Sequence, residues 1–225
     1  MIGRPISLRA SDGHNLTAYE ARPDAPPRGG IVLLQEIFGV TAHIRSVCNG
    51  YANHGYHVVA PALFDRISPG LELGYSKDDA ATGRAMRARI SWEQVFADVT
   101  AAQTQLRGSG KTAAIGYCWG GTVAWRCATQ IENIAGAVCY YATRIEPHVT
   151  EQPRCPVLMH FGDNDPIATP DHARQIRAAH SDASVGIHTY PASHGFNCDE
   201  IANFHPPSAE LALQRSLAFL ASVMN

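Results

Sequence analysis

One short segment of the sequence combines a thiol with the glycine spacing of a reactive turn. Residues 116–121 read GYCWGG, so one glycine stands two positions before Cys118 and another two positions after it. When a strand runs into such a turn and a helix leaves it, the central side chain is exposed above a sheet as a nucleophile elbow. The start of the helix also favours the thiolate, the form of cysteine that attacks carbonyl carbon. The segment therefore predicts nucleophilic chemistry at Cys118.

The flanking sequence decides between this catalytic interpretation and a structural one. Most thiols outside disulfides are buried and pack as small apolar side chains, and we prefer this interpretation for Cys127, Cys139 and Cys155. Around Cys118, however, KTAAIGYC has the apolar pattern of a strand and TVAWRCATQ has the pattern of a helix. The strand, turn and helix of an elbow are all present, and they favour catalysis at Cys118.

Two later segments supply the polar partners that a thiol nucleophile requires. Asp165 follows the apolar run CPVLMHFG, and His194 lies just after SVGIHTYP. Nucleophile, acid and histidine follow each other in this order in α/β-hydrolases, where the imidazole accepts the proton of the nucleophile and the carboxylate orients the imidazole. Asp163 lies in the same turn, so the residues alone leave two candidates for the acid.

A carboxylate beside an apolar stretch is a fourth candidate. Glu36 directly follows the strand-like run IVLLQ, where burial is costly unless the side chain is hydrogen-bonded or faces a solvated cleft. In a cleft, the Glu36 carboxylate would contact Cys118. The backbone N–H groups of Ile37 and Trp119, one from this loop and one from the residue after the nucleophile, would then form an oxyanion hole.

The elements that must position these residues alternate between strands and helices. Residues 5–10 and 15–23, joined by the turn-forming SDGH, predict a β-hairpin, and later apolar runs predict buried strands. Helical patterns separate these runs, which predicts an α/β fold with a single, mostly parallel twisted sheet, helices on both faces and right-handed crossovers. On such a sheet, reactive groups gather beyond the carboxyl ends of the strands, where the four candidates are expected.

Capping and breaking residues predict where several helices begin and end. Thr41 has the residue type of an N-cap, and Gly55 ends the helix that follows it. A helical segment over 79–106 has an expected interruption near Ser91, and a closing helix is expected over 208–223. The irregular stretch 64–79 is a candidate lid, because long loops of this kind are often functional.

Composition places the chain among ordinary globular proteins. Its 225 residues are 45% hydrophobic and 17% charged, which predicts one domain over 1–225. A formal charge of −2 gives no sign of a nucleic-acid or membrane-surface partner, so small molecules are the expected ligands. The sequence has neither a signal-peptide pattern nor a transmembrane run, which predicts a cytoplasmic protein. We expect a monomer or a weak homodimer.

The cysteine pattern argues against both a disulfide scaffold and a metal site. Six cysteines are scattered along the chain without a CxxC pair, which predicts reduced thiols. Zinc sites need clustered cysteine and histidine ligands, and the nearest approach here is His194 with Cys198, which is a weak pair. We therefore expect neither a metal nor another cofactor.

The motifs together resemble the dienelactone hydrolase family, whose members are carboxymethylenebutenolidases of the α/β-hydrolase fold. The resemblance covers nearly the whole chain and rests on QEIFGV, GYCWGG, GDNDPIATP and SHGF, in that order. It implies that Asp165, at the fourth position of a GxxD turn, is the triad acid. It also implies that Glu36 interacts with the resting thiol. Cys118 would then open a lactone through a thioester, which water activated by His194 hydrolyses.

One position departs from the family pattern. Members that act on dienelactone have an arginine shortly after the catalytic histidine to hold the substrate carboxylate, and this chain has Cys198 there. A thiol cannot replace the guanidinium fork that binds a carboxylate. Arg84, Arg87 or Arg89 could bind the carboxylate from another side, or they could be solvated charges on a helix.

Two other functions are compatible with the same residues. A general carboxylesterase or thioesterase would use the same triad with a different pocket, lined by Phe38, Trp119 and Tyr141, although these aromatic residues fit a plain core equally well. A non-catalytic binding protein of the same fold would leave Cys118 idle or redox-sensing. This last hypothesis is the weakest, because a decayed site would have lost some of the four candidate residues.

Overall fold

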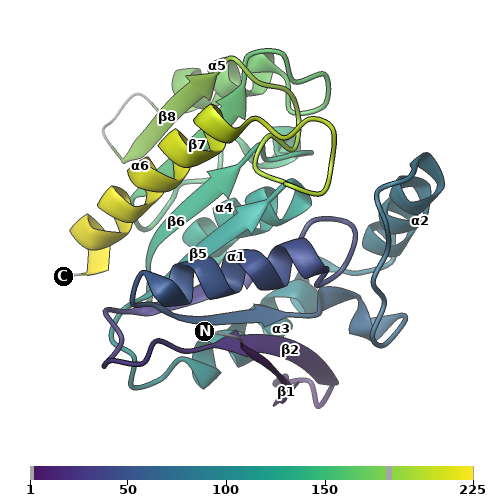
Figure 1. Cartoon of the computed structure of the whole chain (residues 1–225), viewed down its shortest axis with the longest axis vertical. Coiled ribbons are helices and arrows are strands. Elements are labelled where there is room, and N and C mark those ends of the chain that lie inside the picture. Colours follow the sequence, from purple (N-terminus) through teal and green to yellow (C-terminus); the bar gives the residue numbers. More distant parts are fainter. Residues whose placement is uncertain (1–2, 181–183, 225) are drawn as a thin grey trace. The chain divides into compact units, whose positions relative to one another are not determined.

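The chain divides into two compact units, Met1–Thr112 and Ala113–Asn225. The computed structural model describes residues 3–180 and 184–224 (Figure 1). The boundary between the units falls directly after the first residue of a strand. The single domain expected over 1–225 therefore stays a prediction.

The first unit carries the expected N-terminal hairpin and a short parallel pair. Its elements are β1 (Arg4–Arg9), β2 (Asn15–Ala21), β3 (Gly30–Leu34), α1 (Ala42–Asn53), β4 (His57–Pro61), the 3-10 turn η1 (Leu63–Arg66), α2 (Lys77–Ala88) and α3 (Trp92–Gln105). The strand order is β1-β2-β4-β3. β1 pairs antiparallel with β2, β2 pairs antiparallel with β4, and β3 runs parallel to β4. The predicted hairpin is confirmed.

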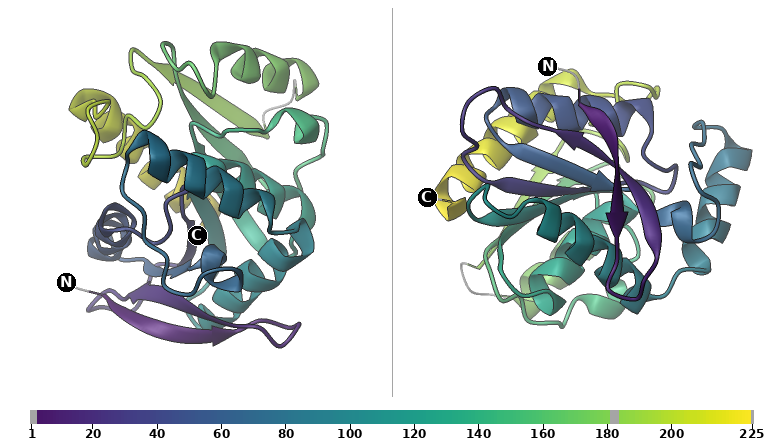
Figure 2. Two further views of the ribbon diagram at one scale, coloured as in Figure 1. Left: turned by 90° about the vertical axis from the view of Figure 1, so that its right-hand side faces the viewer. Right: turned by 90° about the horizontal axis from the view of Figure 1, so that it is seen from below.

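Helices lie on both faces of the strands in this unit. Figure 2 shows α1 and α3 on opposite sides of β4, and both helices contact that strand. The cap predicted at Thr41 is present, since its side chain accepts the N–H of Ile44. The helical stretch 79–106 is interrupted as expected, because Ser91 caps α3 by accepting the N–H of Gln94. The third helix, α2, projects away from the strands (Figure 1).

The second unit continues the alternation of strands and helices. Its elements are β5 (Thr112–Tyr117), α4 (Trp119–Gln130), β6 (Ile134–Tyr140), the 3-10 turn η2 (Glu146–His148), β7 (Val157–Gly162), α5 (Pro170–Ala179), β8 (Val185–Tyr190) and α6 (Pro206–Met224). The strand order is β5-β6-β7-β8, and β7 pairs in parallel with both of its neighbours. In Figure 1, α6 crosses in front of the strands and α4 lies behind them. The closing helix extends slightly beyond the predicted range 208–223.

Burial along the strands follows from this coverage. Every residue of β3, β4, β5 and β7 is buried, as expected for parallel strands covered on both faces. β8 ends the strand order of its unit and is mostly half-buried or exposed. Across the described ranges, none of the helices has the length and apolar character needed to cross a membrane.

Candidate active site

Cys118 occupies a strained turn between β5 and α4. Its backbone has φ 56 and ψ −117, a positive φ that non-glycine residues adopt only where the surrounding structure enforces it. The glycines on either side make the turn feasible. A Cβ on Gly116 would overlap the carbonyl oxygen of Gly120, and one on Gly121 would approach Tyr140 O to 2.8 Å. The sequence GYCWGG thus folds as an elbow with its thiol at the start of a helix.

The second unit brings Cys118, His194 and Asp165 into one hydrogen-bonded chain. His194 Nε2 lies 3.3 Å from the Cys118 sulfur, and His194 Nδ1 lies 2.8 Å from Asp165 Oδ2. Asp165 is buried and Cys118 is 7% exposed, so both ends of this hydrogen-bonded series are largely shielded from water. If Nδ1 carries its proton toward the carboxylate, Nε2 is left to accept the proton of the thiol.

The two candidate acids have different environments. Asp163 is exposed, whereas the buried Asp165 faces His194. The second oxygen of Asp165 accepts the backbone N–H groups of Ile167 at 2.7 Å and Ala168 at 2.8 Å. These bonds satisfy the ionised carboxylate and fix its orientation. Of the two, Asp165 alone is placed to orient the imidazole.

The electrostatic interactions among Cys118, His194 and Asp165 favour a charged imidazole. Burial by itself lowers the pKa of His194, but the charge of the Cys118 sulfur and the hydrogen bond to Asp165 outweigh it and raise that pKa to about 10. A cationic imidazole beside the sulfur stabilises a thiolate. The charged imidazole lies within hydrogen-bond reach of the sulfur that it would stabilise.

Other groups hold the imidazole in place. The ring of Tyr141 meets the ring of His194 edge-on, with a centroid separation of 5.0 Å. Asn203 Nδ2 donates to the backbone carbonyl of His194 at 3.0 Å. Cys198 is buried in the same turn, and its N–H donates to Gly195 O at 2.8 Å. The sequence identified Tyr141 and Cys198, but no signal in it pointed to Asn203.

Thr143 is a further residue that the sequence reasoning missed. Its hydroxyl lies 3.8 Å from the Cys118 sulfur, and its N–H donates to the Cys118 carbonyl at 3.2 Å. The only sign of it in the sequence was a hydroxyl residue a few positions after the end of a strand. The backbone around Thr143 has positive φ angles at Tyr141 (36°) and Arg144 (58°), which residue types do not predict.

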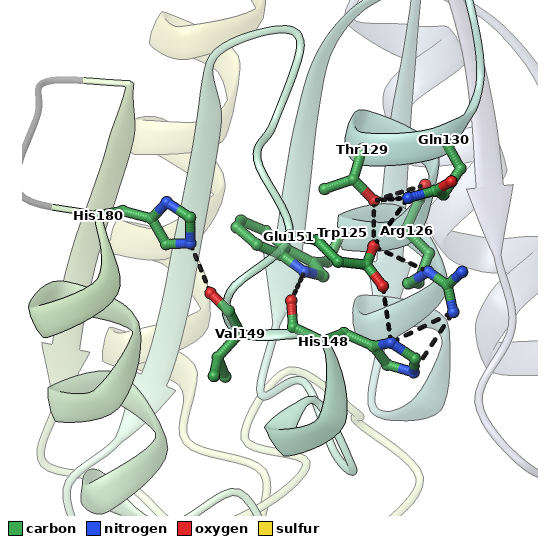
Figure 3. A network of polar contacts seen from close by, with 8 residues as sticks. All are labelled: Trp125, Arg126, Thr129, Gln130, His148, Val149, Glu151 and His180. Carbon is green, nitrogen blue, oxygen red and sulfur yellow. Dashed lines mark hydrogen bonds and ion pairs between the residues drawn. The ribbon is translucent and has the colours of Figure 1, made fainter.

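The segment that carries Tyr141 and Thr143 is anchored at its far end on α4. Figure 3 shows the polar network that forms this anchor. The figure draws Trp125, Arg126, Thr129, Gln130, His148, Val149, Glu151 and His180, and the carbonyl of Val149 lies 2.6 Å from His180 Nε2. Glu151 lies 3.1 Å from Arg126 Nε and 2.9 Å from His148 Nδ1. Trp125 Nε1 donates to His148 O at 2.9 Å, so side chains of the helix hold both the backbone and the charges of the segment.

Glu36, Ile37 and Phe38 belong to the first unit. They directly follow β3 and Gln35; Glu36 is buried, and Ile37 and Phe38 are half-buried. Phe38 packs edge-on against Tyr75, with ring centroids 4.7 Å apart. Its carbonyl accepts the N–H of Leu73 at 2.9 Å, which ties this loop to the candidate lid 64–79. Contacts of Glu36 and Ile37 with Cys118 stay a prediction.

The three candidate arginines lie on or just after α2. Arg84 and Arg89 are exposed, and Arg87 is half-buried. A Cβ on Gly83 would overlap the carbonyl oxygen of Ile37, so this face of α2 packs on the loop after β3. Arg87 is four positions after Gly83 and shares its face. Among the three arginines, Arg87 is the best placed toward the Glu36 loop.

Known proteins share both the sequence and the fold. The dienelactone hydrolase family matches residues 16–224. A carboxymethylenebutenolidase of Pseudomonas putida is 30% identical, covering 100% of this chain and 99% of that protein. A Klebsiella pneumoniae protein named as a candidate dienelactone hydrolase is 29% identical with a TM-score of 0.84, covering 97% of this chain and 99% of that one.

A more distant structure extends the comparison to the fold alone. The dienelactone hydrolase-like promiscuous phosphotriesterase P91 from metagenomic libraries is 15% identical, with a TM-score of 0.77 and full coverage of both chains. The match of the family to most of this chain, together with the relatives above, is decisive. The chain belongs to the dienelactone hydrolase family and has the α/β-hydrolase fold.

Proposed function

We propose that this chain, a hydrolase of ester or lactone bonds, opens small lactones through a thioester on Cys118. The observation that supports this most directly is the hydrogen-bonded chain from the Cys118 sulfur through His194 to Asp165, with separations of 3.3 and 2.8 Å. This is the geometry in which a base removes the proton of a nucleophile while a carboxylate fixes the tautomer of the base. The roles of the individual residues in this reaction are part of the same proposal.

The first half of the reaction forms the thioester. The Cys118 thiolate attacks the lactone carbonyl, and the resulting oxyanion is stabilised by backbone N–H groups. Trp119, the first residue of α4, is the expected donor from the elbow, and Ile37 is the expected donor from the loop after β3. Collapse of the intermediate breaks the ring C–O bond, and the imidazolium of His194 protonates the enolate that leaves.

The second half of the reaction regenerates the thiol. Neutral His194 accepts a proton from water, the hydroxide attacks the thioester carbonyl, and the same N–H groups stabilise the second oxyanion. Expulsion of the sulfur frees the carboxylate product. Asp165, fixed by its bonds to Ile167 and Ala168, keeps the imidazole oriented through both halves.

The substrate class is proposed from the relatives and from the residues near the site. The Pseudomonas putida relative is named a carboxymethylenebutenolidase, so lactones are the first substrates to test. Proposed substrate contacts, in addition to the oxyanion donors, are Phe38, Arg84, Arg87, Arg89, Tyr141 and Cys198. Cys198 supplies no charge for a substrate carboxylate, so a carboxylate would have to be bound by one of the arginines.

The decisive experiment measures turnover together with trapping of the acyl-enzyme. The wild type should hydrolyse members of a panel of small lactones and aryl esters, and rapid acid quench followed by mass spectrometry should find the acyl mass on the Cys118 peptide. Cys118→Ala should lose both signals, whereas Cys155→Ala, a matched change at a half-buried thiol, should keep both. Failure of the wild type to turn over any lactone or ester would exclude the proposal.

A general carboxylesterase or thioesterase is the second candidate, and Cys198 at the expected arginine position favours it. Dienelactone carries a carboxylate, whereas simple aryl esters do not. A kcat/KM that is higher for neutral aryl esters than for dienelactone would support the general esterase. The reverse order, with loss of the preference in Arg87→Gln, would support the lactone hydrolase.

We further propose that the protein acts in the cytoplasm on small molecules and not on nucleic acid or membranes. The formal charge of −2 and the free cysteines of the described residues support this assignment. A monomer or weak homodimer is proposed as well. Light scattering over a range of protein concentrations tests it, and a stable larger assembly would contradict it.

A further inference from the structure

We propose that the hydroxyl of Thr143 is a second polar partner of the Cys118 sulfur, besides His194, and stabilises the thiolate form of Cys118. Thr143 Oγ1 lies 3.8 Å from the sulfur, on the segment that follows β6 in the second unit. The catalytic consequence of this contact rests on the proposed function. The stabilisation itself can be measured without any substrate.

The backbone of Thr143 is fixed against the elbow from two directions. Its N–H donates to the carbonyl of Cys118 at 3.2 Å, and its carbonyl accepts the hydroxyl of Thr122, in the first turns of α4, at 2.6 Å. The carbonyl of Cys118 also accepts the N–H of Gly121 at 3.0 Å. The nucleophile and the threonine therefore share a backbone hydrogen-bond system that holds their side chains together.

The Thr143 hydroxyl is buried and therefore needs the sulfur as a hydrogen-bond partner. Thr143 is 6% exposed, and over residues 3–180 and 184–224 the Cys118 sulfur is the only polar partner of its hydroxyl. Buried hydroxyl groups are nearly always hydrogen-bonded, because leaving one unpaired is costly. A neutral thiol can donate to Oγ1 or accept from it, but a thiolate can only accept. Ionisation therefore turns the contact into a charge-assisted bond in which Thr143 donates.

The titratable groups around the sulfur define what this hydroxyl adds. In the second unit they are His194 at 3.3 Å, Asp165 behind it, and Tyr141, whose ring lies against the imidazole. Glu36 of the first unit is expected beside the thiol as well. Because the thiol and the imidazole are in contact, the charge on one affects the other. Thr143 is not titratable, so its hydroxyl can be removed without changing the charge of the site.

The test is a titration of the thiolate in variants that separate the hydroxyl from the shape of the side chain. Thr143→Val keeps the branched shape and removes the donor, Thr143→Ala removes both, and Thr143→Ser keeps the donor. Ultraviolet thiolate absorbance is recorded against pH as the difference between each protein and its Cys118→Ala counterpart. The midpoint should rise by about half a pH unit in the valine and alanine variants and stay in place in the serine variant.

Alkylation of Cys118 by iodoacetamide, followed on its own peptide, provides a kinetic readout. At pH values below the midpoint the Thr143→Val rate should be about twofold lower than the wild-type rate. At the high-pH plateau it should be no lower, because a more basic thiolate is intrinsically more nucleophilic. A merely structural change would lower the rate at every pH.

Three results would overturn the inference. They are an unmoved midpoint in both Thr143→Val and Thr143→Ala, an equal shift in Thr143→Ser, and a rate loss that persists at the plateau. Lactone turnover is judged separately. If the midpoint shifts but the wild type hydrolyses nothing, the proposed function fails and the role of Thr143 stands. Turnover with an unmoved midpoint overturns the role of Thr143 alone.

Discussion

At the scale of single residues, the carboxylate of Asp165 has a different partner on each oxygen. One oxygen faces His194 Nδ1, and the other accepts the N–H groups of Ile167 and Ala168. An asparagine would keep its carbonyl on the two amides and turn its NH₂ toward the imidazole. The imidazole would then present the wrong tautomer to the sulfur.

Asp165→Asn should therefore lower kcat while leaving the fold intact. By the mechanism above we expect a loss of about 10²–10⁴-fold, measured on whichever lactone or ester the wild type turns over best. Asp163→Asn is the matched control, because Asp163 is exposed in the same turn. Equal losses in the two variants would contradict the assignment of Asp165 as the acid.

The raised pKa of His194 predicts how stability depends on pH. The pKa of His194 is about 10 in the folded protein, compared with 6.5 for a histidine without such interactions. The stabilisation from the bound proton is therefore fully present below pH 6.5 and is lost as the pH rises toward 10. Relative to His194→Gln, the wild type should lose on the order of 1 kcal/mol or more of unfolding free energy over that range. Urea unfolding at both ends measures this; a constant difference would contradict it.

The sequence was informative for residues whose role follows from position after a strand. Cys118, Asp165 and His194 each follow an apolar run, and the structure joins them. Thr143 and Asn203 could not be found this way. Their contacts depend on the path of irregular backbone, including the positive φ of Tyr141, which tertiary packing imposes.

At the scale of elements, the elbow depends on missing side chains as much as on the thiol. Gly116→Ala would force its new Cβ into the carbonyl of Gly120, which is backbone of the turn and cannot rotate away. We expect a destabilisation of about 2 kcal/mol or more and a large loss of turnover. Thermal unfolding and kcat measure the two effects.

Gly50→Ala is the contrasting variant for the elbow prediction. Gly50 lies inside α1, and a Cβ there would meet nothing within 4 Å. Alanine favours a helix interior over glycine by about 1 kcal/mol, so this variant should be as stable as the wild type or more so. Similar destabilisation in both variants would contradict the steric account of the elbow.

Element types were more predictable than the connections between them. Apolar runs and capping residues indicated the strands and the break at Ser91, because these signals are local. The segment after β6 held no such signal. Its shape is set by the polar network of Figure 3, in which partners such as Arg126 and Glu151 are far apart in the sequence.

At the scale of the whole molecule, acid should weaken the first unit through Glu20. Burial raises the pKa of this carboxyl, but hydrogen bonds from Arg22, Gln105 and His57 outweigh it and lower the pKa from 4.5 to about 2. The carboxylate therefore contributes stability above pH 4.5 that is lost as the pH falls toward 2. Glu20→Gln should cost about 2 kcal/mol at neutral pH and much less near pH 2.

The same variant tests whether 1–225 folds as one domain. If it does, Cys48 of the first unit and Cys139 of the second should become reactive at the same urea concentration. Glu20→Gln should lower that concentration by the same amount for both thiols. Both thiols are fully buried in the folded protein, so labelling reports their unfolding. Separate midpoints would show two folding units. The composition alone could not decide this, because chain length constrains the domain count only loosely.

The burial of the other thiols has a practical consequence for counting active molecules. Burial raises the pKa of Cys48, Cys127 and Cys139 far above the usual range and that of the half-buried Cys155 to about 11. Cys198 is fully buried as well. An excess of a thiol-directed dye near neutral pH should therefore label Cys118 first, with an initial phase of one equivalent per folded chain. The native protein would then serve as its own active-site titrant, with no need to engineer its remaining cysteines away.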